Sequence, residues 1–337
     1  MAVASLTYAN IKAILRDWGG GGSDDAAVRA QLLATENALG NIYGLCEWPF
    51  YTIRSRVTTV GGIRFTPSTA VAAGDTTVTD TSALFGATDG LAGRVFFEEG
   101  VAAGQAEIKS NSSTVLTLTQ AYAGAGIAVT ENCMVAKPSY ALPDYFASLK
   151  KLSVQGTTTR PGKMSLEEME SVRARDVSFG PVRGYCIATV DTDARAGQDA
   201  PRLWLWPNPI GPAINSGDDD DTPQTIMLVY RKYCGWFDAT TRVWAAVPAA
   251  DTDILDYPAT PAMKRLLRAA LQLEYARALG KVTQALEQAY GSAIAPAMAR
   301  ADEDDEAFRA QAAAIYGGSY NDRDTVDWYG DMSLFSA

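Results

Sequence analysis

The spacing of apolar residues predicts two helices at the start of the chain. In the first, four apolar residues that follow Thr7, a suitable N-cap, fall on one helical face: Tyr8, Ile11, Leu15 and Trp18. In the second, which should run over Ser23–Gly44, the apolar face consists of Val28, Leu32, Leu39 and Ile42. The glycines at 19–22 separate the two helices, because glycine loses much backbone freedom in a helix. Pro49 cannot continue the second helix.

From residue 54 the period of the apolar positions changes to two, which is typical of strands. Arg54–Thr59 is the first such segment. Residues 61–137 are rich in Thr, Val, Ala and Gly, and short strands are expected there between turn residues: Thr76–Thr79, Arg94–Glu98, Gln105–Lys109, Thr114–Thr119 and Cys133–Lys137. We interpret 61–137 as a β-rich module inserted between two parts, 1–60 and 138–316, of another domain.

One helix, three strands and two further helices are expected in that order between residues 138 and 316. Ser165–Glu168 has the pattern of a capping box that opens a helix. Three strands should follow at Tyr185–Val190, Arg202–Trp206 and Thr225–Arg231, and the last two should form a hairpin with a long loop. The longest predicted helix is Ala262–Tyr290, and another is expected at Ile294–Ile315. We therefore expect an α+β fold with a helical core domain, long C-terminal helices, a small antiparallel sheet and the inserted all-β module.

Composition limits the chemistry that the chain can perform. It has 337 residues, of which 47% are hydrophobic and none is histidine. Without histidine, Ser–His–Asp and Cys–His nucleophile systems are impossible, and so are zinc sites that contain histidine. The formal net charge is −10 at pH 7, so the surface as a whole should not attract nucleic acid or an anionic membrane. We expect no enzymatic activity.

The cysteines indicate neither a metal site nor a redox site. Cys46, Cys133, Cys186 and Cys234 are far apart in the sequence and form no C-x-x-C motif. We therefore expect buried free thiols in a reducing cytoplasm. The N-terminal residues lack a secretory-signal pattern, and no apolar run reaches the about 18 residues needed to span a bilayer. The sequence predicts a soluble protein with no cofactor and no membrane partner.

Two acidic clusters are candidate functional surfaces. The first lies in the loop before the strand at Thr225 and consists of Asp218, Asp219, Asp220 and Asp221. This run could bind calcium, but it lacks the alternating spacing and closing Glu of a calcium loop, so a solvated loop is the preferred interpretation. The second lies in the last predicted helix and consists of Asp302, Glu303, Asp304, Asp305 and Glu306.

The C-terminal segment, residues 317–337, has an unusual composition. It is polar and loop-like but carries five large apolar side chains: Tyr320, Trp328, Tyr329, Leu334 and Phe335. Such a tail is typical of a segment that docks on a partner or on a neighbouring copy. Packing of the tail on its own domain is the alternative.

The order of the motifs along the chain resembles a known family. Two N-terminal helices lead to Glu47–Phe50 and a strand, and a β-rich stretch leads to Tyr140–Phe146. A capped helix then leads to Leu203–Pro209, to a strand at Ile226–Tyr230 and to a long helix after prolines. This order resembles the head-to-tail connector (adaptor) proteins of tailed bacteriophages, including those called tail tubular protein A. No single motif is specific, so the resemblance rests on the order of motifs over about Ala9 to Tyr290.

The resemblance implies a structural virion protein made in the host cytoplasm. Such proteins form a twelve-membered ring at the head–tail junction, bind the portal protein and the tail or nozzle proteins, and let double-stranded DNA pass through the lumen. A negatively charged lumen wall would repel phosphates, so DNA would slide rather than bind. Either acidic cluster is therefore a candidate for the lumen surface. The aromatic tail is the candidate for docking on the portal or on an adjacent subunit.

Three other functions stay open on the sequence alone. Another phage tail or baseplate protein would need a more β-dominated core than the predicted helices suggest. A carboxylate-based glycosidase could use Trp204 and Trp206 as a sugar platform, although the chain lacks the βα repeats that often carry such a site. The module at 61–137 could instead bind a glycan or a receptor.

Overall fold

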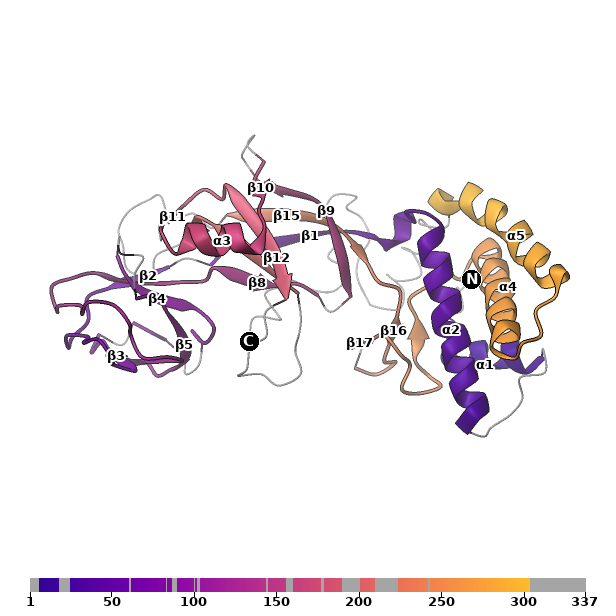
Figure 1. Cartoon of the computed structure of the whole chain (residues 1–337), viewed down its shortest axis with the longest axis horizontal. Helices are drawn as coiled ribbons and strands as arrows, with labels where there is room; N and C mark the ends of the chain where they lie inside the picture. Colours follow the sequence, from indigo (N-terminus) through magenta and orange to yellow (C-terminus); the bar gives the residue numbers. More distant parts are fainter. Residues whose placement is uncertain are drawn as a thin grey trace. The chain divides into compact units, whose positions relative to one another are not determined.

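The computed structural model describes residues 6–17, 25–60, 62–82, 84–86, 90–99, 101, 104–143, 145–155, 160–176, 179–189, 201–209, 224–241 and 243–303. The chain divides into two compact units (Figure 1). The helical unit consists of Met1–Arg54, Asp144–Lys150 and Val229–Trp328, and the β unit consists of Ser55–Pro143, Lys151–Leu228 and Tyr329–Ala337. Each unit has a buried apolar core of its own.

In the described part of the helical unit, helices from both ends of the chain pack together. α1 (Tyr8–Asp17) and α2 (Asp25–Leu45) come from its beginning, and α4 (Pro261–Ala278) and α5 (Gln284–Ala299) come from its later part. α2 and α5 both pack against α4 (Figure 1). A 3₁₀ turn, η1 (Pro49–Tyr51), follows α2. A small sheet in the order β17-β16-β18 completes the unit: β16 (Trp236–Phe237), β17 (Trp244–Ala245) and β18 (Ile254–Leu255).

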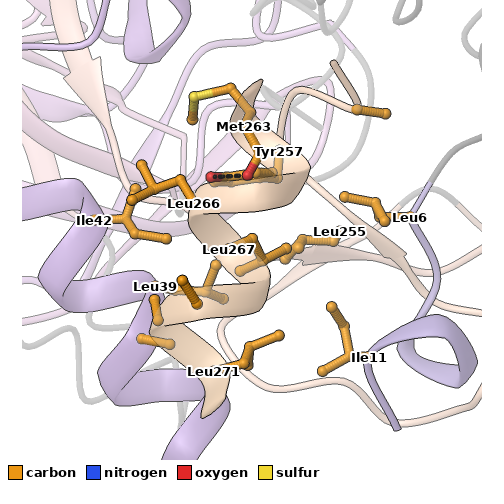
Figure 2. Close-up of a cluster of buried hydrophobic side chains, with 14 of the residues drawn as sticks. Leu6, Ile11, Leu39, Ile42, Leu255, Tyr257, Met263, Leu266, Leu267 and Leu271 are labelled. Carbon is orange, nitrogen blue, oxygen red and sulfur yellow. Dashed lines mark hydrogen bonds between the residues drawn. The ribbon is translucent and has the colours of Figure 1, made fainter. Parts of the chain in front are cut away.

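The core of the helical unit joins α4 to its neighbours. Figure 2 shows apolar side chains of α4 pointing toward those of α1 and the segment before it, of α2 and of β18: Leu6, Ile11, Leu39, Ile42, Leu255, Met263, Leu266, Leu267 and Leu271. The Tyr257 hydroxyl donates a hydrogen bond to the Met263 carbonyl at 3.0 Å. Each fully buried side chain of this size stabilises the fold by about 1.5–3 kcal/mol. Two residues of the apolar stripe predicted for the second helix, Leu39 and Ile42, therefore lie in this core.

Local signals fix both ends of α4. The Thr260 hydroxyl accepts a hydrogen bond from the Met263 N–H at 3.4 Å, and Pro261 opens the first turn. Gly280 has φ +65°, a left-handed conformation that ends the helix. The predicted helix Ala262–Tyr290 is therefore two helices, α4 and α5. The other predicted helix, Ile294–Ile315, begins inside α5 rather than at a helix start.

In the β unit, the largest sheet has six strands in the order β2-β7-β4-β5-β6-β3. Its strands are β2 (Ile63–Phe65), β3 (Thr77–Thr79), β4 (Val95–Glu98), β5 (Ala106–Asn111), β6 (Val115–Leu118) and β7 (Cys133–Ala136). All neighbouring strands are antiparallel. One face of every strand contributes to the same buried cluster, so the sheet curls around it. The strands predicted within 61–137 are confirmed, and β2 is the one that the sequence analysis missed.

The second sheet of the β unit has the order β10-β12-β13-β8 and is covered by a helix. Its strands are β8 (Ser139–Ala141), β10 (Gly162–Lys163), β12 (Gly184–Thr189) and β13 (Pro201–Trp206), and α3 (Leu166–Arg173) packs on β12 and β13. The predicted capping box of α3 is confirmed. The Ser165 hydroxyl accepts from the Glu168 N–H at 3.2 Å, and the Glu168 carboxylate accepts from the Ser165 N–H at 2.8 Å. β11 (Phe179–Gly180) and β14 (Asn208–Pro209) form a separate parallel pair.

The predicted hairpin between the strands at Arg202–Trp206 and Thr225–Arg231 is wrong. β13 pairs with β12 and β8, whereas β15 (Thr225–Lys232) belongs to a three-stranded sheet in the order β1-β15-β9. The boundary between the two units falls within all three of these strands, β1 (Thr52–Thr58), β9 (Phe146–Val154) and β15. The alternation of apolar residues in the sequence identified both strands correctly. Which strands pair depends on contacts between residues that are distant in sequence.

The predicted fold class, a helical core domain with long C-terminal helices, is also wrong. Strands outnumber helices in the described residues, and they form sheets of two, three, four and six strands. The chain is therefore β-rich. The apolar spacing of residues 262–290 suggested one long helix because it continues across Gly280. Strands of two or three residues, such as β8, β10 and β16, are too short to give a periodic pattern.

None of the helices within the described ranges combines the length and the apolar composition that crossing a membrane requires.

Candidate functional site

Groups suited to metal binding or nucleophilic chemistry are few. Within the described residues, no group of three or more carboxylates and thiols could hold a metal ion. The cysteines are free, as predicted, but only Cys133 and Cys186 are buried, while Cys46 and Cys234 are partly exposed. Desolvation raises the pKa of the Cys133 thiol to about 12. Desolvation of the Cys234 sulfur, which lies beside the Asp256 carbonyl although the residue as a whole is partly exposed, raises its pKa to about 12 as well. Because the thiolate is the reactive form, neither thiol is activated as a nucleophile.

The tryptophans of the candidate sugar platform belong to the contact between α3 and its sheet. Trp204 and Trp206 are half-buried on β13 and alternate with the buried Leu203 and Leu205. The Arg173 guanidinium from α3 lies over the Trp204 ring, 4.9 Å from its centroid. Burial lowers the pKa of Arg173 to about 10, so the side chain still carries its charge at neutral pH. One face of Trp204 is thus covered by a cation and is not open to a sugar ring.

Most of the predicted partner-facing residues lie outside the described residues. Asp302 and Glu303 lie in the described part, after α5, and both are exposed. The remaining acidic candidates and the tail candidates are outside it: Asp218, Asp219, Asp220, Asp221, Asp304, Asp305, Glu306, Tyr320, Trp328, Tyr329, Leu334 and Phe335. Their roles in lining a lumen or in docking stay predictions.

The outer face of α2 is a candidate surface that the structure adds. Leu33, Asn37, Gly40 and Gly44 are spaced three or four residues apart, so they share one side of the helix, and all are exposed. We call these residues the α2 outer stripe. Apart from the chain neighbours and the backbone of α2 itself, no heavy atom lies within 4 Å of the position that a Cβ would take on Gly40 or Gly44. Gly40, in the helix interior, costs about 1 kcal/mol relative to alanine, and no internal contact requires either glycine.

An apolar groove adjoins the α2 outer stripe and shares Leu33 with it. The groove has a volume of about 290 Å³. Its apolar lining comes from α2, from β16 and from the segment after β17: Leu32, Leu33, Leu39, Trp236, Ala246, Val247 and Pro248. Leu33 and Val247 are 52% and 51% exposed, and the charged lining residues are Arg29 and Glu36. Exposed apolar side chains that line a groove are suited to receiving an apolar side chain of a partner.

Buried polar contacts hold the C-terminal end of α2 in place. Arg231 donates hydrogen bonds to the carbonyls of Tyr43 and Cys46, and its guanidinium lies 3.7 Å from the Tyr43 ring centroid. A cation at this end of a helix also interacts favourably with the helix dipole. Beside Arg231, Lys232 forms a 2.6 Å ion pair with Asp256, and the two side chains are only 1% and 3% exposed. The α2 outer stripe is therefore presented on a helix with a fixed core face and a fixed end.

The α2 outer stripe was not predicted from the sequence. The helical period of residues 28–42 indicates the buried face and leaves the opposite face unassigned. The available signal was the pair Gly40 and Gly44, four residues apart and away from the apolar stripe. The comparison with protein-family models and the comparison with curated proteins find no match for this chain.

Proposed function

We propose that the chain is a structural virion protein that assembles side by side with its own copies into the adaptor ring between portal and tail. The observation that carries the proposal is the α2 outer stripe with its adjoining apolar groove. In a ring, each copy uses one surface to bind a different surface of the next copy. The α2 outer stripe and the groove would supply one of these two surfaces. A ring of about twelve copies, with DNA passing through the lumen, is the arrangement that the motif order implies.

The two glycines explain why α2 suits such a contact. A helix face without side chains lets another backbone approach closely, and this use compensates for the low helix propensity of glycine. The groove beside the stripe would take an apolar side chain of the neighbouring copy. Arg29 and Glu36, one of each sign, would be placed to restrict the register of the contact.

The β-rich fold favours a second candidate, another tail or baseplate component. A β-dominated core was the feature that this alternative required, and strands predominate in the described residues. Both candidates use assembly with other copies of the chain. They differ in the partner, because only the adaptor has to bind the portal ring.

The test combines oligomer measurement with a matched pair of variants. The purified full chain would be examined by mass photometry and negative-stain microscopy, alone and mixed with candidate portal rings. Leu33→Asp places a charge on the α2 outer stripe and in the groove. Val129→Asp is the control, because Val129 is a similarly exposed apolar residue, 49% against 52%, in the β unit.

We expect rings, or stoichiometric decoration of the portal, for the unmodified chain and for Val129→Asp. Leu33→Asp should abolish the rings while leaving the circular dichroism spectrum of the monomer unchanged. Rings without portal binding would favour the tail or baseplate candidate. Equal assembly of both variants would reject the α2 surface, and a chain that stays monomeric with every partner would reject the assembly role.

A further inference from the structure

Two cations meet where a strand pair of the β unit ends. In the β4–β7 pair Val95 lies opposite Ala136, so the next residues outward along the two strands are Arg94 and Lys137. Like charges across an antiparallel pair destabilise it. A third cation, Arg202 on β13, is close enough to act electrostatically on Lys137. All three side chains are half-buried, so solvent can still reach them.

Polar and aromatic neighbours hold these cations. The Lys137 ammonium lies 5.2 Å from the ring centroid of Tyr140, and Arg202 Nε donates to Ser139 Oγ at 3.0 Å. Tyr140 is only 4% exposed, and its hydroxyl accepts a hydrogen bond from the Val60 N–H at 3.0 Å. The hydroxyl hydrogen itself has no acceptor within the described residues. A buried donor without an acceptor is costly, so an acceptor from a ligand would lower that cost.

Neither Arg94 nor Lys137 has a carboxylate partner in the part of the chain that the structure describes. The group that acts on Arg94 is Tyr140, and those that act on Lys137 are the two arginines. Burial, reinforced by Arg94 and Arg202, lowers the pKa of Lys137 to about 8. Lys137 is therefore still mostly charged at neutral pH, and an anion beside it would stabilise the charged form.

We propose that Arg94, Lys137 and Arg202 form a binding site for a phosphate group. The planar guanidinium suits the oxygens of phosphate, the lysine adds a point charge, and the Tyr140 hydroxyl adds a neutral donor. Free phosphate and the phosphates of a nucleic acid backbone share this chemistry. The site lies in the β unit and does not depend on the proposed assembly through α2.

The test uses the full chain and a matched pair of lysine variants. Binding of inorganic phosphate would be measured by isothermal calorimetry and by the thermal unfolding midpoint, against sodium chloride of equal ionic strength. Lys137→Met should weaken phosphate binding at least about ten-fold, because a charge-assisted hydrogen bond is lost. It should also raise the midpoint in chloride, because a like-charge contact disappears. Lys109→Met, at an exposed position of β5, should bind phosphate like the unmodified chain.

A second arm separates the two sources of phosphate. Binding of a short DNA duplex would be followed by fluorescence anisotropy with and without inorganic phosphate. Duplex binding that needs Lys137 and is displaced by phosphate supports a backbone phosphate as the ligand, and phosphate binding without duplex binding supports a free phosphate. Arg94→Gln serves as the second variant if Lys137→Met does not fold. No phosphate response in the unmodified chain, or an equal loss in Lys109→Met, would overturn the proposal.

Discussion

Replacing Gly40 by alanine should stabilise the isolated chain. Gly40 lies in the interior of α2, and no atom is found within 4 Å of the position that its Cβ would take, so the substitution carries no steric cost. Alanine is favoured over glycine in a helix interior by about 1 kcal/mol. For a unit of this size, that gain should raise the unfolding midpoint by about 2–4 °C.

Thermal unfolding followed by circular dichroism at the helical minimum would measure this effect, and hydrogen exchange of the α2 amides would localise it. Gly74→Ala is the matched control. The space around Gly74 is equally open, but its φ of +97° disfavours any L side chain, so this variant should lose about 1–2 kcal/mol. A midpoint lowered by Gly40→Ala, or one raised by both variants, would refute the reasoning from open space and backbone conformation.

The same position separates stability from assembly. Gly40→Leu places a large side chain into open solvent in the monomer, so the free energy of unfolding should not fall below that of the unmodified chain. If a neighbouring backbone packs on the α2 outer stripe, the same variant should prevent ring formation. A Gly40→Leu chain that assembles normally would show that the glycines do not serve a close contact.

Three further outcomes follow from buried and capping groups. Lys232→Met leaves the buried Asp256 carboxylate unpaired and should lower the free energy of urea unfolding by about 3–5 kcal/mol, whereas Lys232→Met combined with Asp256→Leu should recover most of that loss. The Cys234 thiol should be alkylated slowly in the native protein at pH 8, with a rate that rises as pH approaches its raised pKa of about 12, and labelling as fast as in urea would contradict this. Ser165→Ala removes the cap of α3 and should cost about 1 kcal/mol in urea unfolding, whereas Ser165→Asp should retain most of the stability.

Features that depend on neighbours in sequence were predictable. The capping box at Ser165 and the proline-led start of α4 follow from the chemistry of three or four consecutive residues. Strands with clear alternation, such as β6 and β15, were also found in place, because one of their faces is buried and the other is less so. These local signals act before tertiary contacts form, so the sequence alone reveals them.

Strand pairing and fold class were not predictable in the same way. The alternation in β13 and in β15 says which residues are buried, but not which strand lies alongside. Gly280 shows the limit for helices, because an apolar stripe continues across it: the sequence indicated a kink at this glycine, whereas its φ of +65° shows that α4 ends there. The second error overstated the length of the C-terminal helices and so contributed to the wrong fold class, whereas the first affected only the strand order.

The candidate sites were missed for a different reason. Net charge is an average, and the value of −10 concealed a place where Arg94 and Lys137 lie side by side without a carboxylate from the described residues. The apolar stripe of α2 likewise directed attention to its core face and away from Gly40. Each site becomes visible only when burial and neighbours are known for individual residues.

The two sites share a physical property that argues for function. Exposed glycines in α2 and adjacent half-buried cations at the end of β4 both lower the stability of the chain. No internal contact of the described residues requires the glycines, and no described carboxylate pairs with Arg94 or Lys137. A sequence that otherwise follows local rules, with capped helices and buried alternating strands, has reason to break them where a partner supplies the missing interaction. We therefore expect contacts with a neighbouring chain to offset the stability cost of Gly40 and Gly44, and a bound anion to offset the repulsion between Arg94 and Lys137. Because the two costs lie in different units, each compensation can be removed and measured without disturbing the other.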